Sequence, residues 1–207
     1  MSRLISLVRD QTGLDRLPLR PGCSDSRVSR LESELGISLP DAYRELLRCF
    51  NGQEGQPELT FPPENVVFLS DSEVSRLCRE FREYHDDDQF AMELRDADRV
   101  RSVLYHRGRV PIAFNESGGV YLCVDLIPGP AGTLGQLLVN INEIDCVVLE
   151  RGTAELIERY ARFLETGSVT VERQSPEYGD GYWWARDGRY LDYAGYREIA
   201  AGLDLRR

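Results

Sequence analysis

Lysine is absent from this sequence, histidine occurs twice, and no apolar run approaches the roughly 18 residues of a membrane-spanning helix. The 25 basic side chains are all arginine, and 35 acidic side chains leave a formal net charge of −10. Neutralisation of phosphates by basic side chains drives binding to nucleic acid and to anionic lipid, so we expect neither as a partner. Charges interrupt the first ten residues too early for a secretory signal, so the expected compartment is the cytoplasm.

Paired cysteines are lacking as well, because the five cysteines are widely spaced and none forms a Cys-x-x-Cys pair. This spacing excludes the usual zinc and redox motifs. Four of the five lie among apolar residues, where a thiol behaves as a small buried hydrophobic group. Neither histidine has a recognisable relation to a cysteine, so a catalytic thiolate is not expected.

Motifs of catalysis and of cofactor binding are missing too. The chain has no Walker-type phosphate loop, no dinucleotide fingerprint, no Gly-x-Ser-x-Gly elbow and no His-Glu-x-x-His helix. The run from His85 to Asp88 has carboxylates, but neighbouring residues on a helix point about 100° apart and EF-hand spacing is absent. We therefore expect no enzyme, no cofactor and no metal site.

The pattern of apolar residues predicts one α+β domain over residues 1–167, followed by a C-terminal extension over 168–207 that packs on it. A chain of 207 residues, 42% apolar, can bury one core without a disulfide or metal. Helical periodicity predicts helices near the N-terminus and after Ser24, Pro40, Asp71 and Thr153, with Thr153 as an N-cap. Strands are predicted between them, at 58–61, 66–69, 110–114, 120–126, 136–141 and 146–149.

Acidic side chains concentrate between residues 71 and 99, where ten carboxylates and five arginines give a balance of −5. Such a surface would steer a basic partner, although an ordinary solvated face is the favoured explanation. The candidate partner-binding residues here are Glu83, Asp86, Asp87 and Asp88. Glu116, in the glycine-rich turn between two predicted strands, is a further candidate.

Aromatic side chains concentrate in the tail, where Tyr182, Trp183 and Trp184 are consecutive. They are candidates for partner binding, because tryptophan and tyrosine supply much of the energy of protein interfaces. An exposed platform for sugar rings is a weaker alternative. Burial as a lid on the main core is favoured, because large aromatic rings stabilise a fold most by covering area.

Two segments together resemble the SUKH superfamily, which includes yeast glucan-synthesis regulators and many bacterial toxin-immunity proteins. The first is an amphipathic helix leading through Gly36-Ile37-Ser38-Leu39-Pro40 into a second helix that ends at Asn51-Gly52. The second is a strand, the pair Gly118-Gly119, a strand ending in Asp125, and the loop Gly132-x-x-Gly135-Gln136. The likeness covers about residues 24 to 165, and Val120 departs from the polar residue often found after Gly-Gly.

The resemblance implies a curved, mostly antiparallel sheet flanked by helices, and a protein without catalytic residues. It implies as the leading hypothesis an immunity protein that binds and neutralises a cognate bacterial toxin, with a basic toxin fitting the acidic charge. The alternative is an intracellular regulatory adaptor for cell-wall or other signalling, as in the eukaryotic branch.

Overall fold

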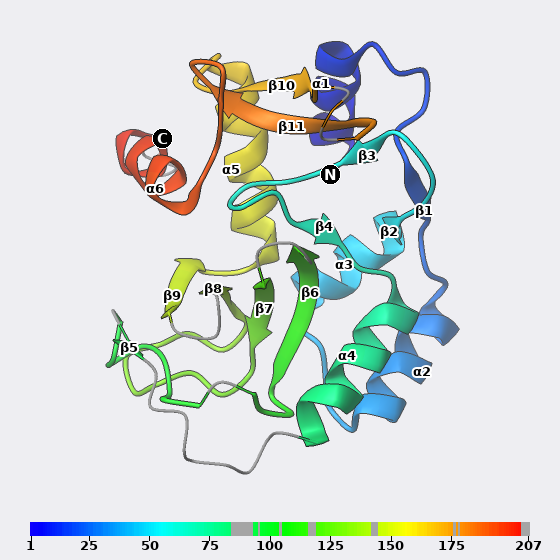
Figure 1. Cartoon of the computed structure of the whole chain (residues 1–207). Helices are drawn as coiled ribbons and strands as arrows, with labels where there is room; N and C mark the ends of the chain where they lie inside the picture. The colour runs from blue at the N-terminus through cyan, green and yellow to red at the C-terminus, as the bar shows by residue number, and fades with distance from the viewer. Residues whose placement is uncertain are drawn as a thin grey trace.

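The computed structural model describes residues 1–83, 93–94, 96–103, 105–115, 119–141, 145–175, 177 and 179–203. Within them the chain forms an α+β fold in which helices flank three separate, mostly antiparallel sheets (Figure 1). The predicted fold class is confirmed. The strands divide among more sheets than the single curved sheet of the sequence-based expectation.

The largest sheet has the strand order β4-β6-β7-β8-β9-β5, with all neighbours antiparallel except the parallel pair β5 and β9. Nearly every described residue of its middle strands is buried, because helices or loops cover both faces. Pro111 lies at a register shift between β6 and β7, where its missing N–H disturbs the ladder least. The strands are β4 (Val67–Phe68), β5 (Glu93–Leu94), β6 (Arg109–Asn115), β7 (Val120–Asp125), β8 (Gln136–Ile141) and β9 (Asp145–Glu150).

Three helices lie beside the β4–β6 edge of this sheet: α2 (Asp25–Leu35), α3 (Asp41–Cys49) and α4 (Asp71–Glu83) (Figure 1). Ser24 caps α2 by accepting a hydrogen bond from the Arg27 backbone N–H, and Gly36 ends this helix with a φ of 64°. Ser70 and Glu73 form a reciprocal capping box at the start of α4, since each side chain accepts from the other's backbone N–H. Strand β2 (Phe50–Gln53) directly follows α3. It pairs with β1 (Leu19–Pro21), which precedes α2, and the two strands form a small sheet.

Helix α5 (Thr153–Glu165) extends from the large sheet toward a smaller sheet of β10 (Thr170–Arg173), β11 (Gly181–Arg186), β12 (Arg189–Tyr190) and β3 (Glu58–Leu59) (Figure 1). Its N-cap is Gly152, without a side-chain cap, so the prediction of Thr153 as the cap is wrong. Thr153 is buried as the first helical residue. Helix α1 (Ser2–Thr12) packs against both α5 and β10.

One apolar core runs through all of these layers, from Leu4 of α1 to Tyr196 of the last helix, α6 (Tyr193–Gly202). Of the five cysteines, Cys49 is exposed and the other four are buried. Burial raises the pKa of the Cys78 thiol to about 12, which keeps it protonated at neutral pH. The boundary at residue 167 stays a prediction, although residues beyond it contribute to the same core.

Candidate protein-binding surfaces

The aromatic cluster of the tail divides between the two faces of β11. Trp184 is 1% exposed, and its ring centroid lies 5.1 Å from that of Tyr160 and 5.8 Å from that of Phe61. Tyr182 is also buried and donates a hydrogen bond from its hydroxyl to the backbone oxygen of Thr12. Burial, the favoured prediction, therefore holds for these two rings, because alternate strand residues face the same side.

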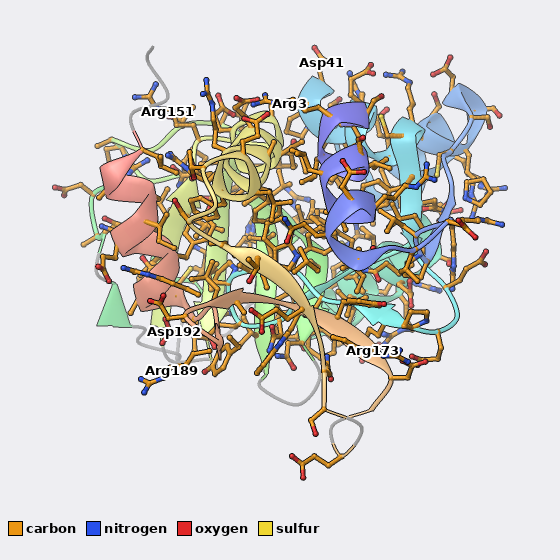
Figure 2. The ribbon with its side chains drawn as sticks, turned by 90° about the horizontal axis from the view of Figure 1, so that it is seen from above. Arg3, Asp41, Arg151, Arg173, Arg189 and Asp192 are labelled. Carbon is orange, nitrogen blue, oxygen red and sulfur yellow. The ribbon has the colours of Figure 1, made fainter. Side chains whose placement is uncertain are left out.

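Trp183 points to the opposite face and is half-buried. Its ring stacks with Tyr190, with centroids 6.3 Å apart and planes at 24°. Tyr190 is 45% exposed, one of two large apolar side chains exposed to this extent in the described residues. Arg173 and Arg189 lie at the two ends of this sheet (Figure 2). We call the outer side of β11 and β12 around Trp183 and Tyr190 the aromatic face.

Several carboxylates between residues 71 and 99 are bound within the fold. Glu73 belongs to the capping box, and Glu80 forms a 2.7 Å ion pair with Arg76. Asp96 accepts a hydrogen bond from the Val148 backbone N–H. Glu83 is exposed at the end of α4. Asp86, Asp87, Asp88 and Glu116 lie outside the described residues, so their partner-binding role stays a prediction.

Asp71 illustrates this internal use of charge most clearly. It is 6% exposed and accepts hydrogen bonds from Arg27 at 2.5 and 2.7 Å, from the Asn51 side chain at 3.0 Å, and from the Ser72 N–H at 2.8 Å. Partial burial favours the neutral acid, but the bonds from Arg27 and Asn51 outweigh it and hold the pKa of Asp71 below its usual value. The pair therefore joins α2 to α4 as a charged bridge.

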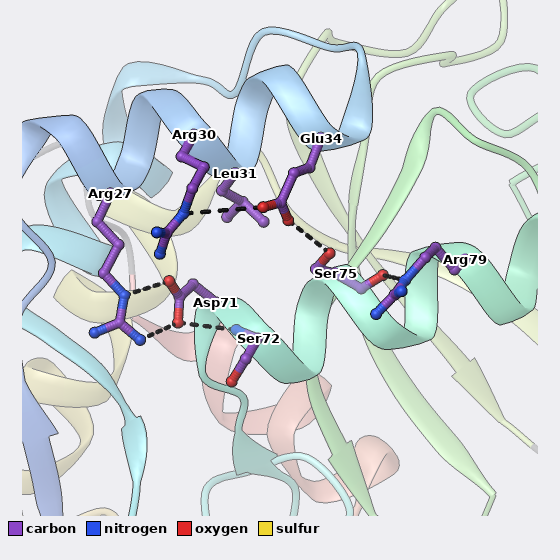
Figure 3. A pocket seen from close by; sticks show the side chains of 8 residues that line it. All are labelled: Arg27, Arg30, Leu31, Glu34, Asp71, Ser72, Ser75 and Arg79. Atoms are coloured by element: carbon purple, nitrogen blue, oxygen red, sulfur yellow. Dashed lines mark hydrogen bonds and ion pairs between the residues drawn. The ribbon is translucent and has the colours of Figure 1, made fainter.

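This bridge forms one wall of a pocket of about 190 Å³ between α2 and α4 (Figure 3). A second bridge crosses the pocket, because Ser75 of α4 donates to Glu34 of α2 at 3.0 Å. Arg30 lies 3.9 Å from the same carboxylate. Each carboxylate in the pocket thus has an arginine partner. The polar side chains that line the pocket mainly join α2 to α4.

The family-like segments meet in space. Gly135, with a φ of +83°, lies so close to Pro40 that an added Cβ would be 3.0 Å from the Pro40 ring. The Gln136 side chain donates to Asp125 at 2.9 Å and to the Arg99 backbone oxygen at 2.8 Å. Asp125 and Gln136 are fully buried, so this network fixes the loop between β7 and β8.

Leu134 stands at the surface of that fixed loop and is 69% exposed. Leu134 is therefore, beside Tyr190, a second large apolar side chain exposed to solvent, and the buried polar network holds its loop in place. The Gly132-x-x-Gly135-Gln136 motif thus has a structural role in the loop. Leu134 offers an exposed apolar side chain with which the aromatic face can be compared by substitution.

A metal-ligand cluster and a membrane-spanning helix are both absent from the described part of the chain. No group of three or more His, Cys, Asp or Glu side chains there could hold a metal ion. No helix there is long and apolar enough to cross a membrane.

Comparison with known families agrees with the likeness seen in the sequence. The model of the SMI1 / KNR4 family (SUKH-1) matches residues 22–165, which is most of the chain. The chain belongs to this family. The matched residues extend from the segment before α2 to the end of α5. SMI1 / KNR4 family proteins bind other proteins and are generally non-catalytic.

A curated relative is similar beyond the family segment. The cell wall biosynthesis/cell cycle regulator smi1 of Schizosaccharomyces pombe is 28% identical over 191 residues, covering 85% of this chain. That share exceeds the family match, so some residues outside 22–165 align as well. The chain spans 38% of the length of the regulator.

Two parts of these surfaces were missed from the sequence. Tyr190 is not among the partner-binding residues expected from the sequence, although Asp187-Gly188 is typical of a two-residue hairpin turn that would place Tyr190 beside Trp183. Both turn residues have positive φ, 52° and 70°, as a type I′ turn requires. The Arg27–Asp71–Asn51 bridge carries no local signal, because its members are far apart in the sequence.

Proposed function

We propose that this chain is a non-catalytic regulatory adaptor that binds a partner protein through the aromatic face. The supporting observation is that half-buried Trp183 of β11 stacks on the exposed Tyr190 of β12, while Trp184 fixes the opposite side of β11 in the core. Rigid, partly exposed aromatic rings lose little conformational entropy when a partner covers them, which suits an interface hot spot.

Similarity to the smi1 regulator favours the adaptor over the toxin-immunity role. The alignment reaches residues outside the SUKH-1 segment, so the likeness includes flanking parts that pack on the shared core. The regulator's printed function, in cell wall biosynthesis and the cell cycle, suggests an analogous housekeeping process for this chain.

Capture of partners from the native cells, read by mass spectrometry, tests the adaptor. The wild-type chain should recover housekeeping proteins, and the double variant Trp183→Ala/Tyr190→Ala should lose them by tenfold or more, about 1.4 kcal/mol. Leu134→Ala is the matched control, because it removes an exposed apolar side chain elsewhere. Equal recovery by both variants would place the binding surface somewhere other than the aromatic face.

Toxin neutralisation remains a second candidate because the net charge of −10 would steer a basic toxin toward the chain. If this role is correct, the dominant captured protein is the product of a neighbouring toxin gene, and co-expression of the chain restores growth. Absence of protection against such a toxin, together with capture of housekeeping proteins, would leave the adaptor.

A further inference from the structure

Two adjoining depressions flank the segment between α1 and β1. One has a volume of about 270 Å³ and the other about 220 Å³, and both are lined by Arg16, Leu17 and Leu19. Arg9 and Arg20 border the larger one, and Phe50 lies at its base. We call the two depressions together the arginine groove. Most of its residues precede position 22, where the SUKH-1 match begins.

The groove is basic on a strongly acidic molecule. Its larger half holds three arginines against one carboxylate, Asp15, and the smaller half adds Glu54. The chain as a whole has a net charge of −10. The local net charge of the groove is therefore opposite in sign to the net charge of the whole molecule. An anionic ligand would be repelled over much of the surface and attracted here.

The arginines of the groove have unused hydrogen-bonding capacity. Arg16 is exposed, and no hydrogen bond or ion pair links it to another residue of the described chain. Arg9 donates once, at 3.5 Å, to the Leu14 backbone oxygen. Nε of Arg20 is buried and lacks a hydrogen bond within the described residues, although Glu54 lies 3.7 Å away. Guanidinium groups with free donors bind carboxylates in bidentate geometry.

Beneath the arginines the groove is apolar. Leu17 and Phe50 are 6% and 5% exposed, and Leu19 is half-buried. The bordering strand β1 pairs with β2, and no other described strand pairs with it, so an extended peptide could also add to the β1–β2 sheet. An apolar base, cationic walls and a bordering strand suit a polypeptide better than a small anion.

We propose that the arginine groove binds an acidic peptide segment of a partner protein, with an apolar side chain seated on Leu17 and Phe50 and carboxylates on Arg9 and Arg16. The proposal shares with the adaptor function only that the ligand is a protein. It uses residues different from those of the aromatic face, so each surface can be disproved without the other.

Cys49 provides a direct probe of this site. It lines the groove and is exposed, whereas the other four cysteines are buried, so N-ethylmaleimide should modify Cys49 selectively in the folded chain. Selection of a random-peptide phage library on the full-length protein supplies the ligand. The selected peptides should combine Asp or Glu with an apolar residue, and modification of Cys49 should block them.

Charge reversal then tests the arginines. Arg9→Glu and Arg16→Glu should each weaken a selected peptide, measured by fluorescence anisotropy, and the double variant should weaken it about tenfold or more. Arg151→Glu, an exposed charge reversal lying away from α1 (Figure 2), should leave affinity unchanged, as should Trp183→Ala. Circular dichroism melting curves check that each variant is folded, and Cys49 modification supplies a second readout that needs no substitution.

Three results would overturn the proposal. Selected peptides could be neutral or basic, or acidic peptides could bind equally well to the double variant and to the modified protein. Alternatively, single-stranded polyuridylate could bind in an Arg16-dependent manner while acidic peptides do not. If Trp183→Ala/Tyr190→Ala loses partner capture but still binds the selected peptide, the result supports two independent binding surfaces.

Discussion

Adjacent tryptophans have opposite roles in this molecule. Trp184 is buried among aromatic rings, whereas Trp183 faces outward and stacks on Tyr190. The alternation of a strand requires this division, because successive side chains point to opposite faces of the sheet. The consecutive pair in the sequence is therefore one core residue and one surface residue.

Replacement of each tryptophan by alanine should separate these roles. Trp184→Ala leaves a cavity beside Phe61 and Tyr160 and should lower the free energy of unfolding by about 3–5 kcal/mol. Trp183→Ala should cost about 1 kcal/mol or less, because its ring is only partly covered. Urea denaturation followed by circular dichroism measures both. Similar losses for the two variants would contradict the assigned faces.

The Asp71 bridge predicts a pH dependence. The folded-state pKa of Asp71 is below its usual value of about 3.9, so the carboxylate contributes stability above that pH and loses it as pH falls through the folded pKa. At pH 7, Asp71→Asn should lower the unfolding free energy by about 1–3 kcal/mol, and this difference should shrink as the pH falls through the folded-state pKa of Asp71.

Urea midpoints at pH 7 and in strongly acidic buffer provide the measurement. Asp41→Asn is the matched control, because that side chain is 93% exposed and should change stability little at either pH. A pH-independent effect of Asp71→Asn would show that hydrogen-bond geometry, and not the ionised charge, accounts for the bridge.

Among the elements, those with a long apolar period were predictable from the sequence and those without one were not. Helices α2, α3, α4 and α5 repeat apolar residues at helical spacing, and β6 and β7 flank a glycine-rich turn. Helix α6 buries only Tyr193 and Tyr196, too few to show a period. Strand β1 has three residues, one of them proline, so its pairing depends on tertiary contacts.

Helix α6 is held in place by contacts between residues far apart in the sequence, which no local sequence pattern predicts. Arg159 of α5 forms a 2.8 Å ion pair with buried Glu150 and donates to the backbone oxygens of Ala200 and Leu203. Tyr196 donates to the same carboxylate at 2.9 Å. One arginine thus satisfies a buried carboxylate and the carbonyl end of α6 together.

Arg159→Leu should therefore release α6. Without the guanidinium, Glu150 loses its ion-pair partner and the last carbonyls of α6 lose their donor, at a cost of about 3–5 kcal/mol. Hydrogen–deuterium exchange should accelerate over residues 193–203 more than in β7 and β8. Arg162→Leu is the control, because its ion pair with Glu158 is 41% exposed on both sides. Unchanged protection of α6 would contradict this role.

For the whole molecule, the central question is whether residues 168–207 are an appendage or a part of the core. Leu191, Trp184 and Tyr196 are each 2% exposed or less and belong to the same apolar cluster as Leu4 and Val28. Strand β11 also pairs with β3, which precedes the large sheet in sequence. The aromatic face is therefore built on strands whose other side completes the core.

Truncation after Gly167 tests this arrangement. Removal of Trp184 and Tyr196 would expose Phe61, Tyr160 and Phe163, which are at most 4% exposed in the whole chain. Since buried aromatic rings each contribute several kcal/mol and a domain is stable by only about 5–15 kcal/mol, the 1–167 fragment should lose cooperative unfolding. Urea denaturation and binding of a hydrophobic dye measure this loss, with the full-length chain as the reference. A fragment that unfolds cooperatively near the wild-type midpoint would instead establish 1–167 as an independent domain. The aromatic face would then be a detachable addition to it, and partner capture should fail with the fragment while its fold survives.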